Sequence, residues 1–354
     1  MLPRLLLGIG LLVAAQLLAW LVIVPLRPAP TKAQEIFDAL TPGEFAGTLM
    51  LGGFRGLACD LLWMRADLAK ENGRFYESVA LFQTISRIQP RFEQAWTYMS
   101  WDLAYNLSHE VESDEAKWSW VIAGLRANIE GIRRNPDSDK LLRHLAWMLH
   151  HKGDLFHSRI EAANWSSELN PVLALINAQV DKGREIAPFE DRAGYANFDL
   201  SAKLYRASIA LTERNGGSGP PAFVRRMVPL AMESAGNIRR NRGDHIGALR
   251  RYLDALREWQ VVKIWGEATP RSEGDAAQRR GTVESYERNE GSLRRKAQQL
   301  ARSLAPTPEV GEEVVALIDA RNIDAAEVAV AKPGWRTAIA RGGVRWLDEV
   351  VVGR

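Results

Sequence analysis

The sequence predicts an all-α protein in which one N-terminal transmembrane helix precedes an irregular α-solenoid of the tetratricopeptide type. Two observations carry this prediction: an uncharged hydrophobic segment at residues 5–24, and the spacing of Gly73, Phe82, Pro90 and Trp96. In a tetratricopeptide repeat, a small residue turns the chain between helices A and B, and a large side chain fills helix B. A proline then ends helix B, and an aromatic residue opens the next helix A.

Residues 5–24 are long enough to cross a membrane. Twenty helical residues rise about 30 Å, the thickness of the hydrocarbon core of a bilayer, and this segment has no charged side chain. Trp20 lies near its end, where an amphipathic ring suits the interface, and Arg27 follows. Gly8 and Gly10 would permit close approach of another helix. We expect an uncleaved, single-pass anchor in the inner membrane, with the soluble part on the periplasmic side.

The repeat pattern recurs after the first unit. Gly236, Ala248 and Tyr252 match a later repeat, in which two small residues allow the helices to approach and the tyrosine fills the space beyond. Leu142, Ala146 and Gly153 match another helix A and its turn. Further, degenerate repeats are expected at Leu155–Pro171 and Phe198–Glu213.

The sequence divides into three parts. They are an anchor with a proline-rich spacer (1–32), a helical-repeat domain (33–265) and a C-terminal extension (266–354). A glycine- and proline-rich stretch near 214–221 predicts a flexible loop inside the second part. The extension begins with a long polar helix, Ala276–Leu304. Gly342-Gly343 then favours a short β-hairpin, with a terminal helix as the alternative.

Composition narrows the range of functions. Hydrophobic residues make up 46% of the 354 residues and charged residues 25%, as in a folded protein. Cys59 is the only cysteine, which excludes an internal disulfide framework and a paired-cysteine metal site. Residues 33–115 carry 13 acidic and 6 basic side chains, whereas residues 225–302 carry 10 acidic and 17 basic ones. This asymmetry could orient the scaffold on a partner, or it could reflect two solvated surfaces of different composition.

Three segments resemble a known family: LGGFRGLACDLLWMRAD at 51–67, RFEQAW…WDLAYNLS at 91–108 and LRHLAWMLHHKGD at 142–154. They are similar to an uncharacterised family of bacterial, membrane-anchored tetratricopeptide-repeat proteins. The similarity extends over residues 48–155 and, more loosely, over 221–259. The family has no established enzymatic activity, so the resemblance implies an anchored, all-helical scaffold.

We therefore expect a scaffold that binds a protein partner, as an accessory subunit of a large membrane complex for transport, secretion, respiration or photosynthesis. The expected contacts are an acidic loop, a tryptophan pair and a basic face, comprising Glu112, Asp114, Trp118, Trp120, Arg239, Arg240, Arg250 and Arg251. Arg55, beside three glycines, is expected to contact lipid phosphate or a membrane partner. We expect no cofactor and no nucleic-acid partner.

The alternative is an enzyme. Glu233 and Ser234 resemble the Glu-Ser pair of lytic transglycosylases, in which a glutamic acid serves as the general acid. An exported cell-wall hydrolase could use Glu233 in this way. The glycine-, aromatic- and glutamine-containing segments that follow in those enzymes are missing from this sequence, and the repeat register explains Gly236 without catalysis.

Overall fold

The computed structural model describes residues 55–162, 165–178, 197–215, 222–270 and 273–336. These residues are all-helical and contain no strand, which confirms the predicted fold class at this level. None of the helices described is long and apolar enough to span a bilayer. The predicted membrane segment, the loop at 216–221 and the glycines of the predicted hairpin lie outside the described residues.

Twelve α-helices and one π-helical turn make up the described chain. Their bounds are α4 Arg55–Glu71, α5 Phe75–Ile88, α6 Glu93–Trp101, η3 Asp102–Leu107, α7 Asp114–Arg134, α8 Asp139–Ala162, α9 Trp165–Asn177, α10 Asn197–Arg214, α11 Ala222–Asn241, α12 His245–Glu267, α13 Glu273–Leu304, α14 Pro308–Asp319 and α15 Ile323–Ala331.

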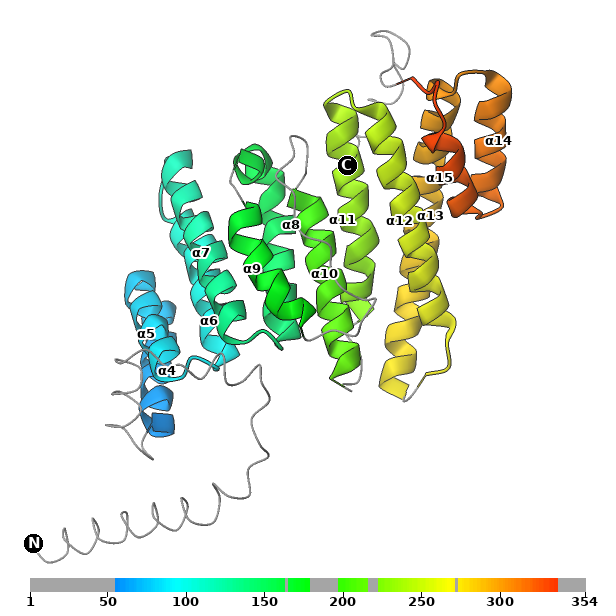
Figure 1. Ribbon diagram of the computed structural model, residues 1–354. Coiled ribbons are helices and arrows are strands. Elements are labelled where there is room, and N and C mark those ends of the chain that lie inside the picture. Colours follow the sequence, from blue (N-terminus) through cyan, green and yellow to red (C-terminus); the bar gives the residue numbers. More distant parts are fainter. Residues whose placement is uncertain (1–54, 163–164, 179–196, 216–221, 271–272, 337–354) are drawn as a thin grey trace, which may run out of the picture.

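The helices stand side by side in a row that follows the chain, from α4 and α5 at one end to α14 and α15 at the other (Figure 1). Most helices pack mainly on their neighbours in the row, so a main core cluster runs along the stack. This arrangement is consistent with an α-solenoid, in which neighbouring units bury each other's apolar faces. At the far end, α15 folds back onto α12 as well as α14.

The turn and packing positions predicted for the first helix pair are seen in the structure. Gly73 has φ +70°, the left-handed conformation that glycine adopts at no steric cost, and the chain reverses there between α4 and α5. Phe82 is fully buried in α5, which ends at Ile88 before Pro90. The indole of Trp96 donates a hydrogen bond of 2.8 Å to the carbonyl of Pro90, which fixes the next helix against this turn.

The close helix pair around Gly236 is also confirmed. A Cβ at this position would lie 2.5 Å from a ring carbon of Tyr252, so only glycine lets α11 and α12 approach this closely. The Tyr252 hydroxyl donates a hydrogen bond of 2.7 Å to Asn237 on α11. Gly243 has φ +84° at the turn between the two helices, equivalent to Gly73 in the first repeat.

The predicted turn at Gly153 is wrong, because α8 continues through this residue to Ala162. The partner of α8 is α10 and not the next helix along the chain. Small polar side chains of α10 make the pairing: Ser201 donates to the Ala146 carbonyl at 2.7 Å and Asn197 to the Leu149 carbonyl at 2.8 Å. The degenerate repeat expected at Leu155–Pro171 falls on the end of α8 and the start of α9, whose main described partners are α10 and α7.

Helix α9 instead packs beside α7. Arg126 of α7 holds it there through an ion pair of 2.9 Å with Glu168. The long polar helix expected at Ala276–Leu304 is present as α13. After it, Thr307 caps α14 by accepting a hydrogen bond from the Val310 amide.

A π-helical turn, η3, directly continues α6. It contains Asp102, whose side chain is completely buried. The Asp102 carboxylate accepts hydrogen bonds from Ser78 at 2.9 Å and Asn106 at 2.6 Å, and it lies 3.2 Å from the Lys70 ammonium. A buried charge needs partners of this kind, and here they come from α4, α5 and η3 itself.

Candidate partner-binding groove

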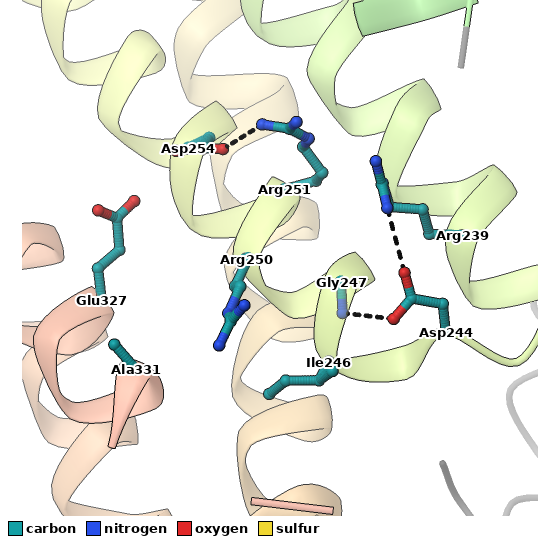
Figure 2. A pocket seen from close by; sticks show the side chains of 9 residues that line it. All are labelled: Arg239, Asp244, Ile246, Gly247, Arg250, Arg251, Asp254, Glu327 and Ala331. Atoms are coloured by element: carbon teal, nitrogen blue, oxygen red, sulfur yellow. Dashed lines mark hydrogen bonds and ion pairs between the residues drawn. The ribbon is translucent and has the colours of Figure 1, made fainter. Parts of the chain in front are cut away.

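The predicted basic face forms one wall of a groove between α11, α12 and α15, which we call the α12 groove (Figure 2). Its volume is about 480 Å³. It is lined by Arg239, Asp244, Ile246, Gly247, Arg250, Arg251, Asp254, Glu327 and Ala331. The groove forms because α15 returns to α12 and brings the end of the described chain beside residues about 80 positions earlier in sequence.

Two of the predicted arginines are neutralised by neighbouring carboxylates. Arg239 pairs with Asp244 at 3.1 Å, and Arg251 pairs with Asp254 at 2.8 Å. Both also face the carboxylate of Asp199, which is 5% exposed and lies 2.9 Å from Arg251 and 3.7 Å from Arg239. These guanidinium groups are therefore held in place on the wall, and they join α10, α11 and α12.

Arg250 differs from its neighbours. Its side chain is exposed, and within the described part of the chain it has neither an ion-pair nor a hydrogen-bond partner. Figure 2 shows the side chain directed away from Arg251 and Asp254, beside Ile246. A guanidinium offers five N–H donors in a planar fork and binds carboxylates in a bidentate geometry. Among the described residues, Arg250 is thus an unpaired cation in a groove whose other arginines are ion-paired.

The opposite wall is fixed by Arg257 of α12. Its guanidinium contacts Glu327 and lies 2.9 Å from Asp324, and both of these carboxylates belong to α15. The hydrogen bond to Glu327 raises the pKa of Arg257. Burial raises the pKa of Glu327, and the bond from Arg257 opposes that shift. These contacts tie α15 to α12 and keep the groove at a set width.

Asp244 shapes the base of the groove through helix capping. Its side chain accepts a hydrogen bond of 2.9 Å from the Gly247 amide and so begins α12. A Cβ on Gly247 would clash with the Asp244 carboxylate. The same carboxylate pairs with Arg239, so one residue both starts the helix and orients the wall.

The other predicted contact residues do not join this groove. Arg240 lies on α11, half-buried and not among the lining residues. Trp118 and Trp120 lie on α7, partly buried against the core, and the Trp120 ring meets that of Tyr76 at 5.6 Å. Glu112 and Asp114 are exposed just before and at the start of α7. The acidic loop and the basic face are thus at separate places along the stack.

Two further predictions concern Arg55 and Glu233. Arg55 is the first residue of α4 and is half-buried. Glu233 on α11 forms an ion pair of 2.7 Å with Lys296 on α13. The Glu233 carboxylate is thus engaged in a contact between two helices of the stack. The membrane-contact candidates Gly8, Gly10, Trp20 and Arg27 lie outside the described residues.

Sequence reasoning found the basic wall but missed the opposite one. Asp244 carried a detectable signal, since an aspartate directly after a turn glycine is typical of a helix N-cap. No comparable signal marked Glu327 or Ala331, because their position depends on the return of α15. In the part of the chain that the structure describes, no three metal-ligating side chains converge. No protein-family model and no curated protein matches the sequence.

Proposed function

We propose that the protein is a membrane-anchored, tetratricopeptide-type scaffold that binds a protein partner through the α12 groove. The anchor is residues 5–24, the membrane is the inner membrane, and the solenoid stands on its periplasmic side. The partner presents a carboxylate to Arg250. In this role the protein is an accessory subunit that stabilises a large membrane complex, of the transport, secretion, respiratory or photosynthetic kind.

The observation that supports this proposal best is the contrast between Arg250 and the arginines around it. Paired arginines hold the fold together, and their charge is already neutralised. Arg250 contributes nothing to that network, yet it is exposed in a groove formed by three helices. Helical-repeat proteins bind extended or helical segments on such surfaces, with a few anchor residues supplying most of the affinity.

The test is co-purification of the full chain after gentle detergent extraction. The wild type should retain a partner in a fixed ratio. The Arg250→Glu variant should lose this partner, because the new carboxylate repels the carboxylate of the partner. Arg295→Glu is the matched control, since Arg295 is an exposed arginine on α13 that also has no ion-pair partner among the described residues. A protein that emerges alone in several detergents, or equal loss in both variants, would contradict the proposal.

The hydrolase alternative has no observation in its favour, because Glu233 is engaged by Lys296. It can be tested separately. If Glu233→Gln abolished cell-wall cleavage by the purified chain, the scaffold proposal would be overturned in favour of an enzyme. We expect no cleavage by either form.

A further inference from the structure

The first helix of the described stack leaves an apolar face without a protein neighbour among the described residues. Leu57, Leu61, Met64 and Leu68 of α4 are 56%, 59%, 67% and 55% exposed. Their spacing of four, three and four residues places them on one side of the helix. The opposite side, with Cys59, Ala66 and Ala69, is buried against the stack. A row of four large, exposed apolar side chains is a typical interaction surface.

Acidic side chains follow one edge of this apolar stripe. At 100° per residue, Asp60, Asp67 and Glu71 fall together on one flank. None of the three has an ion-pair partner in the described ranges, in contrast to most of the acidic side chains farther along the stack. The other flank carries Arg65, which pairs at 2.8 Å with Glu77, a carboxylate that Arg74 also contacts. The stripe thus has one acidic edge, and the other edge carries no unpaired carboxylate among these residues.

We infer that this stripe binds an amphipathic helix of a partner protein. The apolar face of that helix packs on the leucines and the methionine of α4, and its lysines or arginines lie along the edge that meets Asp60, Asp67 and Glu71. Paired helices choose their partners in this way, by an apolar seam for affinity and flanking charges for orientation. The surface is separate from the α12 groove and does not depend on it.

The acidic edge argues against three other occupants, which are the preceding segment of this chain, an anionic membrane surface and a second copy packed antiparallel. The chain immediately before α4, residues 33–54, contains Glu35, Asp38 and Glu44 and no lysine or arginine, so it would place acid against acid. An anionic membrane surface would be repelled for the same reason. A second copy whose α4 packed antiparallel would bring the two acidic edges together.

The probe is a pair of synthetic amphipathic peptides with the same leucine seam, one with lysines and one with glutamates along the edge. Binding is measured by fluorescence anisotropy to the full chain in nanodiscs of zwitterionic lipid, with empty nanodiscs as the blank. The lysine peptide should bind about tenfold more tightly than the glutamate peptide, because exposed ion pairs are individually weak and three of them act together.

Three variants test the assignment. The double change Leu61→Ser and Met64→Ser should abolish binding of both peptides. The triple change Asp60→Asn, Asp67→Asn and Glu71→Gln should equalise the two affinities. Arg250→Glu should leave both unchanged, so failure of this inference is distinguishable from failure of the groove. All replaced side chains are exposed or half-buried, and circular dichroism checks that the variants fold.

Three results would overturn the inference. One is equal binding of the two peptides by the wild type. Another is unchanged binding after the Leu61 and Met64 changes. The third is self-association of the wild type, seen in sedimentation and lost in that double variant, which would make a second copy the occupant.

Discussion

At both ends of the described stack, a glycine in the left-handed conformation turns the chain between two paired helices. The contacts that hold the helices together differ between the two ends. At the first end, α4 to α8, aromatic rings make the contacts: Trp63 meets Phe82 at 5.0 Å, and Trp101 stacks on Trp147 at 5.1 Å. At the other end, α11 to α15, close helix approach and ion pairs dominate, as around Gly236 and Arg257. The first end leaves an apolar helix face exposed, and the second encloses a charged groove.

This difference shows how a repeat scaffold can offer two kinds of binding surface. Turn geometry is common to both ends, so the backbone does not distinguish them. The side chains between the turns decide whether a helix face ends up apolar or ionic. Four changes should probe the two ends, with expected effects that decrease from the aromatic core to the turns.

Truncation of an aromatic core residue should have the largest effect. Phe82→Ala removes a fully buried ring that contacts Trp63 and Tyr98, and it should lower the free energy of unfolding by about 4 kcal/mol. Urea unfolding followed by hydrogen exchange in α4 and α5 would measure it. Tyr76→Ala on the same helix is the control, because Tyr76 is 63% exposed. Similar losses in both variants would mean that the aromatic cluster does not stabilise this end.

Acid should weaken the aromatic end through His144. Burial between Trp101 and Trp147 lowers the pKa of His144 to about 4. The unfolded chain therefore binds a proton that the folded chain does not, and stability falls as the pH drops from about 6.5 to 4, by up to about 3 kcal/mol. For the His144→Gln variant, the free energy of unfolding should depend less steeply on pH over this range. His151→Gln, an exposed position on the same helix, should keep the wild-type slope.

Added volume should disturb the close pair at the other end. Gly236→Ala places a Cβ 2.5 Å from the Tyr252 ring and should cost about 2 kcal/mol, with increased hydrogen exchange in α11 and α12. Gly281→Ala is the control within α13, where no atom lies within 4 Å of the added Cβ. It should stabilise the protein by about 0.5 kcal/mol through helix propensity. A neutral Gly236→Ala would show that the helices separate without cost.

The smallest effects should be equal at the two ends. Gly73→Ala and Gly243→Ala each force an L-residue into the left-handed region, at φ +70° and +84°, with a cost of about 1 kcal/mol. No atom lies within 4 Å of either added Cβ, so sterics within the turn are the only cause. Clearly unequal losses of thermal stability would mean that the two turns do not follow a common rule.

Local signals explain which parts of the fold could be predicted. Gly73, Pro90 and Gly236 act within one helix pair, so their spacing alone indicated the turns and the close approach. The pairing of α8 with α10 could not be predicted in this way, because Ser201 and Asn197 recognise carbonyls about 50 residues away. The same limit applied to Glu327, which reaches the groove only through the return of α15.

The sequence by itself determined an all-helical stack and the positions of its clearest turns, because helix periodicity and left-handed glycines are local properties. It also identified Arg239, Arg250 and Arg251 as a basic face. Only the tertiary structure decided that Arg239 and Arg251 are neutralised while Arg250 has no partner among the described residues, and that the apolar side of α4 is exposed in this part of the chain. Those outcomes depend on which side chains from distant parts of the sequence lie beside each residue, and the packing of the helices determines these neighbours.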